Sequence, residues 1–445
     1  MTNKTINIFE YERPYKKLDK SQVLSDNEKN RLIEINNKLK TLLKADSDII
    51  TVLNGDRVRT YHYVGVLQVG KRRIQILPKL YRHDGTDENK VNEALRNLHF
   101  MLGYTMDLRT GETPVSLFKK GDILEIYISM FLAELEKVLQ SSIFKEYITV
   151  EENLSTVRGK LLLAQHIKSN ATRNLPLAYC QFDELTRDNL INQTIKYTLR
   201  ILRAASRRYE NHRKIEQLLF IFDDISDRAI LPYHREKIHF NRLNMHFKPV
   251  INKCFMFIRN FSVDLTSGRF EYGGIVFDMN KLFEEFIGRI IKRHKKDLGL
   301  EDYKIELQYN IGKLDKYGAI MPKTDIAILK NDKIHMIIDT KYKISLKEKL
   351  KPSNQDIYQM IAYGIAGNCP EIVLLYPKPE DYSFASGGEP ITIPLHGEEC
   401  HADCDTPREL KIHVGVVDLM KENLKYSEKE IIEDLKQVVE PITKF

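Results

Sequence analysis

The sequence predicts a multidomain α/β protein, and two observations carry that prediction. The chain has 445 residues, which is more than one hydrophobic core usually serves. Its hydrophobic periodicity also changes twice, from alternation to helical spacing and back to alternation between helices. We therefore expect a strand-containing module over 1–115, a mostly helical connector over 116–265, and over 266–445 a compact module whose central mixed sheet is flanked by helices.

The composition is that of a soluble globular protein, with 42% hydrophobic and 29% charged residues. The first residues lack the apolar core of a signal peptide, and no later apolar run approaches the length of a membrane span. Five scattered cysteines are too few for a disulfide framework. These features predict a location in a reducing cytoplasm.

The net charge of +7 is a mild excess, from 69 basic against 62 acidic residues. Local clusters are more informative than the total. The segments "GKRRIQILPK" and "KYKISLKEKLK" both concentrate positive charge, and the second contains Lys343 and Lys347. Such a cluster favours a polyanionic ligand such as DNA.

The first region is predicted to contain a strand over 5–9, a helix that begins with a capping box of Ser25 and Glu28, and a hairpin around "VGKRR". The hairpin segment nearly matches a phosphate-binding P-loop. Arg72 replaces the hydroxyl residue that such a loop needs after its lysine, and alternation continues where a helix should start. We therefore predict a hairpin here and no nucleotide site.

The middle region shows apolar spacings of three and four in "ILEIYISMFLAELEKVL", "DNLINQTIKYTLRILRAA" and "RKIEQLLFIF". It is interpreted as a helical platform without a catalytic set, and the acidic run "DDISD" near Asp223 as a solvated helix end. The last third then opens with a helix, capped by Asp278 and stopped by Gly299. Its remaining predicted elements are the strands "KIELQYNIG", "KTDIAIL" and "KIHMIID", the helix "SNQDIYQMIAYGIA" and the strand "EIVLLYP".

Two acidic residues are predicted to face each other across a hairpin. The turn "KNDK" joins two alternating runs, and a centre near Asp332 places Asp325 opposite Asp339. Two facing carboxylates repel unless a cation lies between them, and Mg²⁺, with Mn²⁺ as a substitute, prefers such oxygen ligands. Lys341 follows two residues after Asp339 on the same face, where it could orient or deprotonate the water that attacks a phosphodiester. Asp339 and Lys341 alone would suggest a plain ion pair, but Asp325 on the paired strand favours an active site.

The helices on either side of the hairpin supply further candidates. On the preceding helix, Glu284 falls at the border of the apolar stripe, whereas Glu285 points further towards solvent. On the following helix, Gln359 and Tyr363 share a face at a spacing of four and can donate hydrogen bonds to phosphate or base edges.

An ordered set of chemical side chains therefore runs through the last third: Glu284, Asp325, Asp339, Thr340, Lys341, Gln359 and Tyr363. This set resembles the PD-(D/E)XK nuclease fold in its RecB-like form, although Thr324 stands where that motif usually has proline. The whole chain resembles the McrC family, the endonuclease subunits of McrBC restriction systems. That likeness rests on "YVGVLQVGKRRIQILPKL", "VRGKLLLAQHI", "YCQFDELTRDNLINQTIKYTL", "NKLFEEFI", "PKTDIAIL", "IIDTKYK" and "DIYQMIAYG".

The resemblance implies a Mg²⁺-dependent nuclease that cuts foreign, cytosine-modified DNA in antiviral defence. It acts only with a hexameric AAA+ partner, McrB, which binds and hydrolyses GTP, while the amino-terminal region of McrC docks into that ring and stimulates its GTPase. The resemblance further implies these roles: metal ligands Asp325, Asp339, Thr340 and Glu284, catalytic lysine Lys341, with Gln359 and Tyr363 as the accompanying pair. DNA contacts are expected at Lys343, Lys347, Gln359 and Tyr363, and partner contacts at Lys71, Arg72 and Arg73.

Two other functions compete with this one. A stand-alone RecB-like repair nuclease would need no partner, and a non-catalytic adaptor would activate an AAA+ ring while its nuclease fold had decayed. The intact acids and lysine argue against decay, because buried charges without a use are costly. Zinc-like spacing of His396, Cys400, His401 and Cys404 is interpreted as a polar surface insertion, since all four fall within nine residues among acids.

Overall fold

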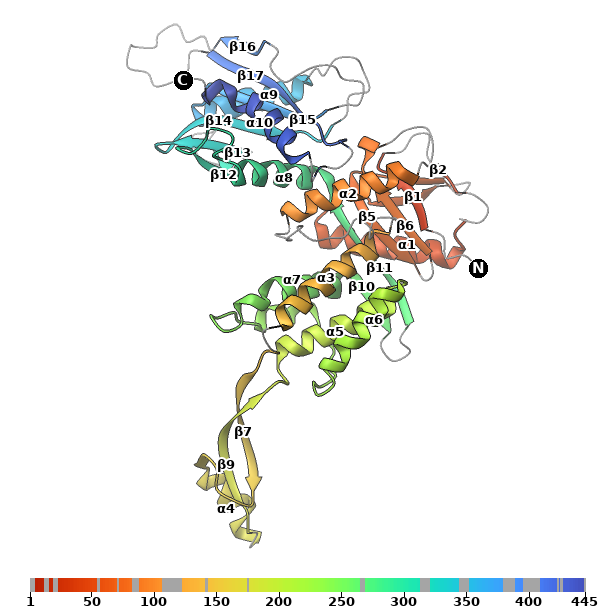
Figure 1. Ribbon diagram of the computed structural model, residues 1–445, viewed down its shortest axis with the longest axis vertical. Coiled ribbons are helices and arrows are strands. Elements are labelled where there is room, and N and C mark those ends of the chain that lie inside the picture. Colours follow the sequence, from red (N-terminus) through yellow and green to blue (C-terminus); the bar gives the residue numbers. More distant parts are fainter. Residues whose placement is uncertain are drawn as a thin grey trace. The chain divides into compact units, whose positions relative to one another are not determined.

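The computed structural model of the chain is shown in Figure 1. It describes residues 5–443 except for 12–15, 19–22, 54–56, 70–71, 82–87, 106–121, 141–142, 174–175, 265–268, 313–320, 344–351, 379–388, 395–408, 422–423 and 425–426. The chain divides into two compact units, the first formed by 1–66, 72–122 and 276–445 and the second by 67–71 and 123–275. Most of the first and last of the three predicted regions thus falls in one unit, whereas 67–71 and 266–275 belong to the other. Among the described helices, none has the length and apolar character needed to span a bilayer.

The amino-terminal elements are β1 (Thr5–Phe9), β2 (Lys16–Lys17), α1 (Asp26–Leu43), β3 (Ile50–Leu53), β4 (Arg57–Thr60), β5 (Tyr63–Val69), β6 (Arg72–Leu77), the 3-10 helix η1 (Lys79–Tyr81) and α2 (Glu88–Thr105). The predicted capping box at the start of α1 is present, because Ser25 and Glu28 each accept a backbone hydrogen bond from the other. β1 pairs in parallel with β6, which neighbours β5. A strand therefore follows at Arg72, where a P-loop would require a helix, and the predicted hairpin is confirmed.

The carboxy-terminal elements are α8 (Met279–Arg293), β12 (Lys304–Asn310), β13 (Lys323–Lys330), β14 (Lys333–Thr340), α9 (Asn354–Gly367), β15 (Glu371–Pro377), β16 (Ile391–Pro394), β17 (Glu409–Val417) and α10 (Glu428–Thr443). Six strands form one mixed sheet in the order β12-β13-β14-β15-β17-β16. The pairs β12/β13 and β13/β14 are antiparallel, whereas β14/β15 and β15/β17 are parallel. The predicted central mixed sheet is thus present.

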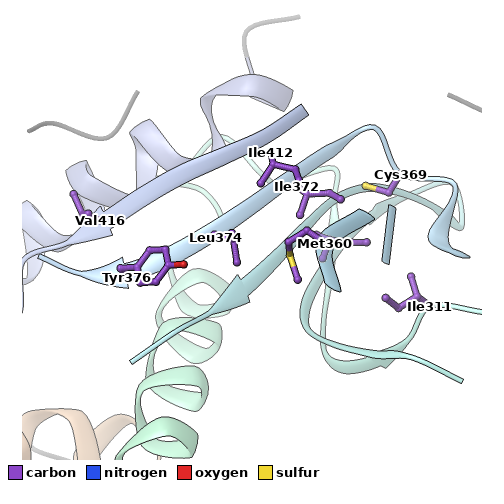
Figure 2. Close-up of a cluster of buried hydrophobic side chains, with 9 residues drawn as sticks. Ile311, Met360, Cys369, Ile372, Leu374, Tyr376, Ile412 and Val416 are labelled. Atoms are coloured by element: carbon purple, nitrogen blue, oxygen red, sulfur yellow. The ribbon is translucent and has the colours of Figure 1, made fainter. Parts of the chain in front are cut away.

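Helices bring side chains to this sheet from two directions. α8 packs on β12, β13 and β14, and α9 packs on β14, β15 and β17. Asp278 caps α8 as predicted, by accepting a hydrogen bond from the Asn280 amide, but α8 ends at Arg293 and turns lead on to Gly299. Figure 2 shows the apolar cluster that Met360 of α9 shares with Ile372 of β15 and Ile412 of β17. This buried cluster fixes α9 against the mixed sheet.

The second unit contains α3 (Ile123–Leu139), β7 (Glu146–Leu154), β8 (Lys160–Leu161), α4 (Leu163–Ser169), η4 (Ala171–Arg173), β9 (Ala178–Thr186), α5 (Leu190–Ala205), α6 (Tyr209–Ile221), η5 (Pro232–Lys237), η6 (Met245–Phe247), α7 (Lys248–Asn260), β10 (Phe261–Asp264) and most of β11 (Arg269–Asp278). The predicted helices α3, α5 and α6 are present. The expectation of a mostly helical region was wrong for 146–186, where β7, β9 and β8 form a three-stranded sheet. In Figure 1 β7 and β9 of this sheet extend from the helices of their unit as a long arm, with α4 beside them.

Candidate active site

The β13–β14 hairpin brings two acids together at its open end. Asn331 and Asp332 both adopt left-handed backbone angles (φ 52° and 59°), as a two-residue hairpin turn requires. Pairing then starts at Lys330 with Lys333, and this register alone would place Asp325 opposite Ile338. A β-bulge between Ile328 and Leu329 shifts the register by one, so that Ile326 pairs with Ile338. The same register continued outward by one residue places Asp325 opposite Asp339, as the sequence predicted.

Asp339 lies at the centre of a chain of polar contacts. Its carboxylate is buried, with 3% of the side chain exposed, and its Oδ2 lies 2.6 Å from Nζ of Lys341. The same Nζ donates a hydrogen bond to Oε1 of Gln359 (3.0 Å), and Nε2 of Gln359 donates one to the Tyr363 hydroxyl (2.6 Å). Four of the predicted residues therefore form one connected network, in which α9 fixes the position of the lysine.

Asp325 is held by the residue between Asp339 and Lys341. Its Oδ2 accepts hydrogen bonds from both the amide (2.8 Å) and the hydroxyl (2.7 Å) of Thr340. These two bonds orient the Asp325 carboxylate relative to β14. The predicted role of Thr340 as a metal ligand stays a prediction, since the contact that its hydroxyl makes is with Asp325.

The structure separates the roles of the two adjacent acids on α8. Glu284 is half-buried and accepts a hydrogen bond from Nε2 of Gln308 on β12. Glu285 instead pairs with Arg289 one turn along the helix (2.7 Å), and 45% of its side chain is exposed. Electrostatics agree with this division: besides burial, the negative charges of Asp325 and Asp339 raise the pKa of Glu284. Glu284 is therefore the α8 acid on the side of the candidate site.

The three acids of this cluster have raised pKa values, because the nearby positive charge does not offset their burial and mutual repulsion. Burial and the negative charge of Asp325 raise the pKa of Asp339 to about 6. Burial and the negative charges of Asp325 and Asp339 raise the pKa of Glu284 to about 7. Burial also raises the pKa of Asp325, against the opposing effect of the Thr340 hydrogen bonds. For Lys341, burial lowers the pKa, but Asp339 and the other carboxylates outweigh it, so that the pKa is raised and the ammonium form is favoured.

The donor set fits a hard divalent cation such as Mg²⁺, because all its atoms are carboxylate oxygens whose mutual repulsion a cation would relieve. Among the described residues no three His, Cys, Asp or Glu side chains are already arranged to share an ion. Here Lys341 contacts Asp339, Thr340 contacts Asp325, and Gln308 contacts Glu284. Asp325 and Asp339, with Glu284 as a third acid, are the side chains that could hold the ion.

The predicted DNA contacts are divided between described and undescribed residues. Lys343 is 59% exposed at its side chain, and its Nζ donates to both oxygens of Asp356 (2.9 and 3.0 Å). Asp356 also completes the predicted capping box of α9 with Ser353. Lys347 lies outside the described residues.

The predicted partner contacts differ in their exposure. Arg73 is completely buried and forms an ion pair with Asp122, so its guanidinium presents no surface to another chain. Arg72 is partly exposed and pairs with Glu28 at 2.9 Å. Alternation on β6 explains the difference, because adjacent residues of a strand point to opposite faces. Lys71 lies outside the described residues, as do His396, Cys400, His401 and Cys404 of the zinc-like segment.

Gln308 is a member of this cluster that the sequence did not predict. The signal was available in part, because "KIELQYNIG" precedes the hairpin and an antiparallel β12 would place polar side chains near Asp325. Nothing in the sequence indicated the left-handed backbone of Gln308 (φ 52°), which departs from ordinary strand geometry.

Comparisons with known proteins relate the whole chain to McrBC systems. This chain is similar to a solved structure described as a refined half-complex from a tetradecameric assembly of Thermococcus gammatolerans McrB AAA+ hexamers with bound McrC. The match covers 98% of this chain and 100% of the other chain, with a TM-score of 0.66 and 22% sequence identity. A second, of the Thermococcus gammatolerans McrBC complex, covers 68% of this chain and 89% of its own, with a TM-score of 0.50 and 23% identity. No curated protein matches the chain in sequence.

At these identities the structural matches show a shared fold. The family described as "McrBC 5-methylcytosine restriction system component" matches residues 58–377, which is well over half of the chain and includes the whole candidate site from Glu284 to Tyr363. The chain is therefore a member of the McrBC restriction-system component family.

Proposed function

We propose that this chain is the Mg²⁺-dependent DNA endonuclease subunit of a GTP-driven, McrBC-like restriction complex. The observation that carries the proposal is the buried network in which Asp339 contacts Lys341, with Asp325 held opposite by Thr340. Acids on paired strands with a lysine two residues later match a PD-(D/E)XK nuclease centre. Burying these charges costs folding free energy that well-packed apolar residues at the same positions would avoid, which supports a role for them beyond stability.

In the proposed reaction, water attacks phosphorus, a new P–O bond forms, and the bridging P–O bond breaks as the leaving oxygen takes a proton. When bound, Mg²⁺ supplies positive charge to the anionic phosphate and acidifies the attacking water. Asp325, Asp339 and Glu284 would hold it. Lys341, kept in its ammonium form by Asp339 and fixed by Gln359, would orient the water and neutralise charge that develops on phosphate.

In the metal-free protein the neighbouring carboxylates raise the pKa of Lys341, which agrees with this orienting role. Removal of a proton from the water is the alternative role for the lysine. Tyr363 and Gln359 would hold Lys341 in place and contact DNA from α9, while Lys343 would contact the phosphate backbone. Foreign DNA with modified cytosine is the proposed substrate, in keeping with the description of the matching family.

The proposed partner is a hexameric McrB-like AAA+ GTPase, as in the assembly named for the similar solved structure. GTP would be bound by that partner, because the P-loop-like segment of this chain continues as strand β6. We further propose that this chain stimulates the GTPase of the partner. Among the residues predicted to contact the partner, Arg72 has a partly exposed side chain that could take part in this contact.

Plasmid cleavage with Mg²⁺ tests this function. Three reactions are compared: this chain alone, the chain with the AAA+ protein encoded beside it plus GTP, and the same mixture with Lys341→Ala. We expect cutting only in the complete wild-type mixture. Cutting by the chain alone would instead support a stand-alone nuclease. No cutting of methylated or unmodified DNA, with GTPase stimulation retained, would support a non-catalytic adaptor.

A further inference from the structure

Gln308 has an unusual backbone conformation at an informative position. It lies within strand β12, yet its φ of 52° is in the left-handed region, which costs a non-glycine residue conformational energy. Antiparallel pairing of Leu307 with Ile326 and of Tyr309 with Thr324 places Gln308 opposite Asp325. The strained residue is therefore the direct cross-strand neighbour of a proposed metal ligand.

The strain changes where the Gln308 side chain points. Regular alternation would send Leu307 and Gln308 to opposite faces of the sheet. Leu307 packs closely on α8 at Gly288. A Cβ added to this glycine would lie only 2.5 Å from Cδ2 of Leu307. Gln308 nevertheless reaches the same face of α8, where its Nε2 donates a hydrogen bond to Glu284, one turn before Gly288. Left-handed or bulged residues re-aim side chains in this way next to active sites.

We infer that Gln308 is a positioning residue for the metal site, whose strained backbone aims its amide at Glu284 and holds that carboxylate towards Asp325 and Asp339. The inference rests on the proposed nuclease function. Gln308 itself holds no ion and touches no reacting atom in this account. It acts through Glu284, as residues that hydrogen-bond to metal ligands do.

Glycine at this position separates the two roles of Gln308. A Gln308→Gly variant adopts the left-handed backbone without strain but lacks the amide. We expect its melting temperature without metal to rise by about 2 °C, while its dissociation constant for Mn²⁺, measured by calorimetry on the full chain, weakens by about tenfold. If Gln308 only supported the fold, its replacement would not raise the melting temperature while weakening Mn²⁺ binding.

A double variant tests whether the effect passes through Glu284. Glu284→Gln should weaken Mn²⁺ binding, and Gln308→Gly combined with it should add no further loss, because the amide then has no carboxylate to position. Glu285→Gln is the matched control, since Glu285 pairs with Arg289 instead, and its Mn²⁺ affinity should equal that of the wild type.

Unchanged Mn²⁺ affinity in Gln308→Gly would overturn the inference, as would an equal further loss in the Glu284→Gln background. A different result marks failure of the proposed function itself. If the wild type and Asp339→Ala bind Mn²⁺ equally poorly, the site holds no metal, and both the function and the positioning role are refuted.

Discussion

Burial and the negative charges of Asp325 and Asp339 raise the pKa of Glu284 from 4.5 to about 7. In the unfolded chain the same carboxyl ionises near its ordinary value. Below pH 4.5 the group is protonated in both states and costs nothing. As the pH rises towards 7 the unfolded state loses its proton first, so the folded state becomes progressively less favoured, and above about pH 7 the cost is complete.

Replacing Glu284 by glutamine should therefore stabilise the protein at pH 8 and leave it unchanged near pH 3, in buffer with a chelator. Because Glu284 is only half-buried, solvent screening reduces the gain to about 1 kcal/mol, or roughly 2 °C in melting temperature. Thermal unfolding at the two pH values measures it. Equal shifts at both pH values, or a similar gain in Glu285→Gln, would contradict an electrostatic cost located at Glu284.

At the scale of elements, the β13–β14 hairpin was predictable because its turn residues and its alternation are local signals. The register of Asp325 with Asp339 was also correct, although it depends on a bulge after Ile328 that no local signal indicates. The arm over 146–186 was missed for a physical reason. β7 is exposed on both faces, so its sequence lacks the apolar alternation by which half-buried strands are identified.

The position of α9 depends on a close approach to the sheet at Gly364. A Cβ at this residue would lie 2.6 Å from Cδ2 of Leu410 and 2.9 Å from Cδ1 of Ile372, both of which are fully buried. We expect Gly364→Ala to push α9 outward, cost about 1–2 kcal/mol of unfolding free energy and reduce DNA cleavage, because Gln359 would move away from Lys341. Ile365→Ala, at an exposed position of the same helix, is the control.

Chemical denaturation and cleavage by the assembled complex are the measurements for this pair. A Gly364→Ala protein that cuts DNA like the wild type would show that the position of α9 does not matter to Lys341. Equal losses of DNA cleavage in Gly364→Ala and Ile365→Ala would likewise show that the close approach of α9 at Gly364 does not matter to Lys341.

At the scale of the molecule, the first unit joins parts of the chain that are distant in sequence. Lys79 donates from its Nζ to the carbonyl of Tyr342 (2.9 Å), and its amide donates to Oε1 of Glu10 (3.0 Å). Glu10 is completely buried, and burial raises its pKa. These contacts tie the amino-terminal region to the residue after Lys341. Sequence analysis could not predict them, because long-range polar contacts, like the burial of Arg73, depend on the assembled fold.

In the proposed function, Asp339 and Lys341 serve chemistry and not assembly. The direct measurement is to test Asp339→Ala and Lys341→Ala, each mixed with the AAA+ partner and GTP, for plasmid cleavage, complex formation and GTP hydrolysis. We predict that cleavage falls at least about 100-fold while assembly and GTP hydrolysis stay at wild-type levels. Retained cleavage, or loss of complex formation in both variants, would contradict the account, because these residues would then be dispensable or structural.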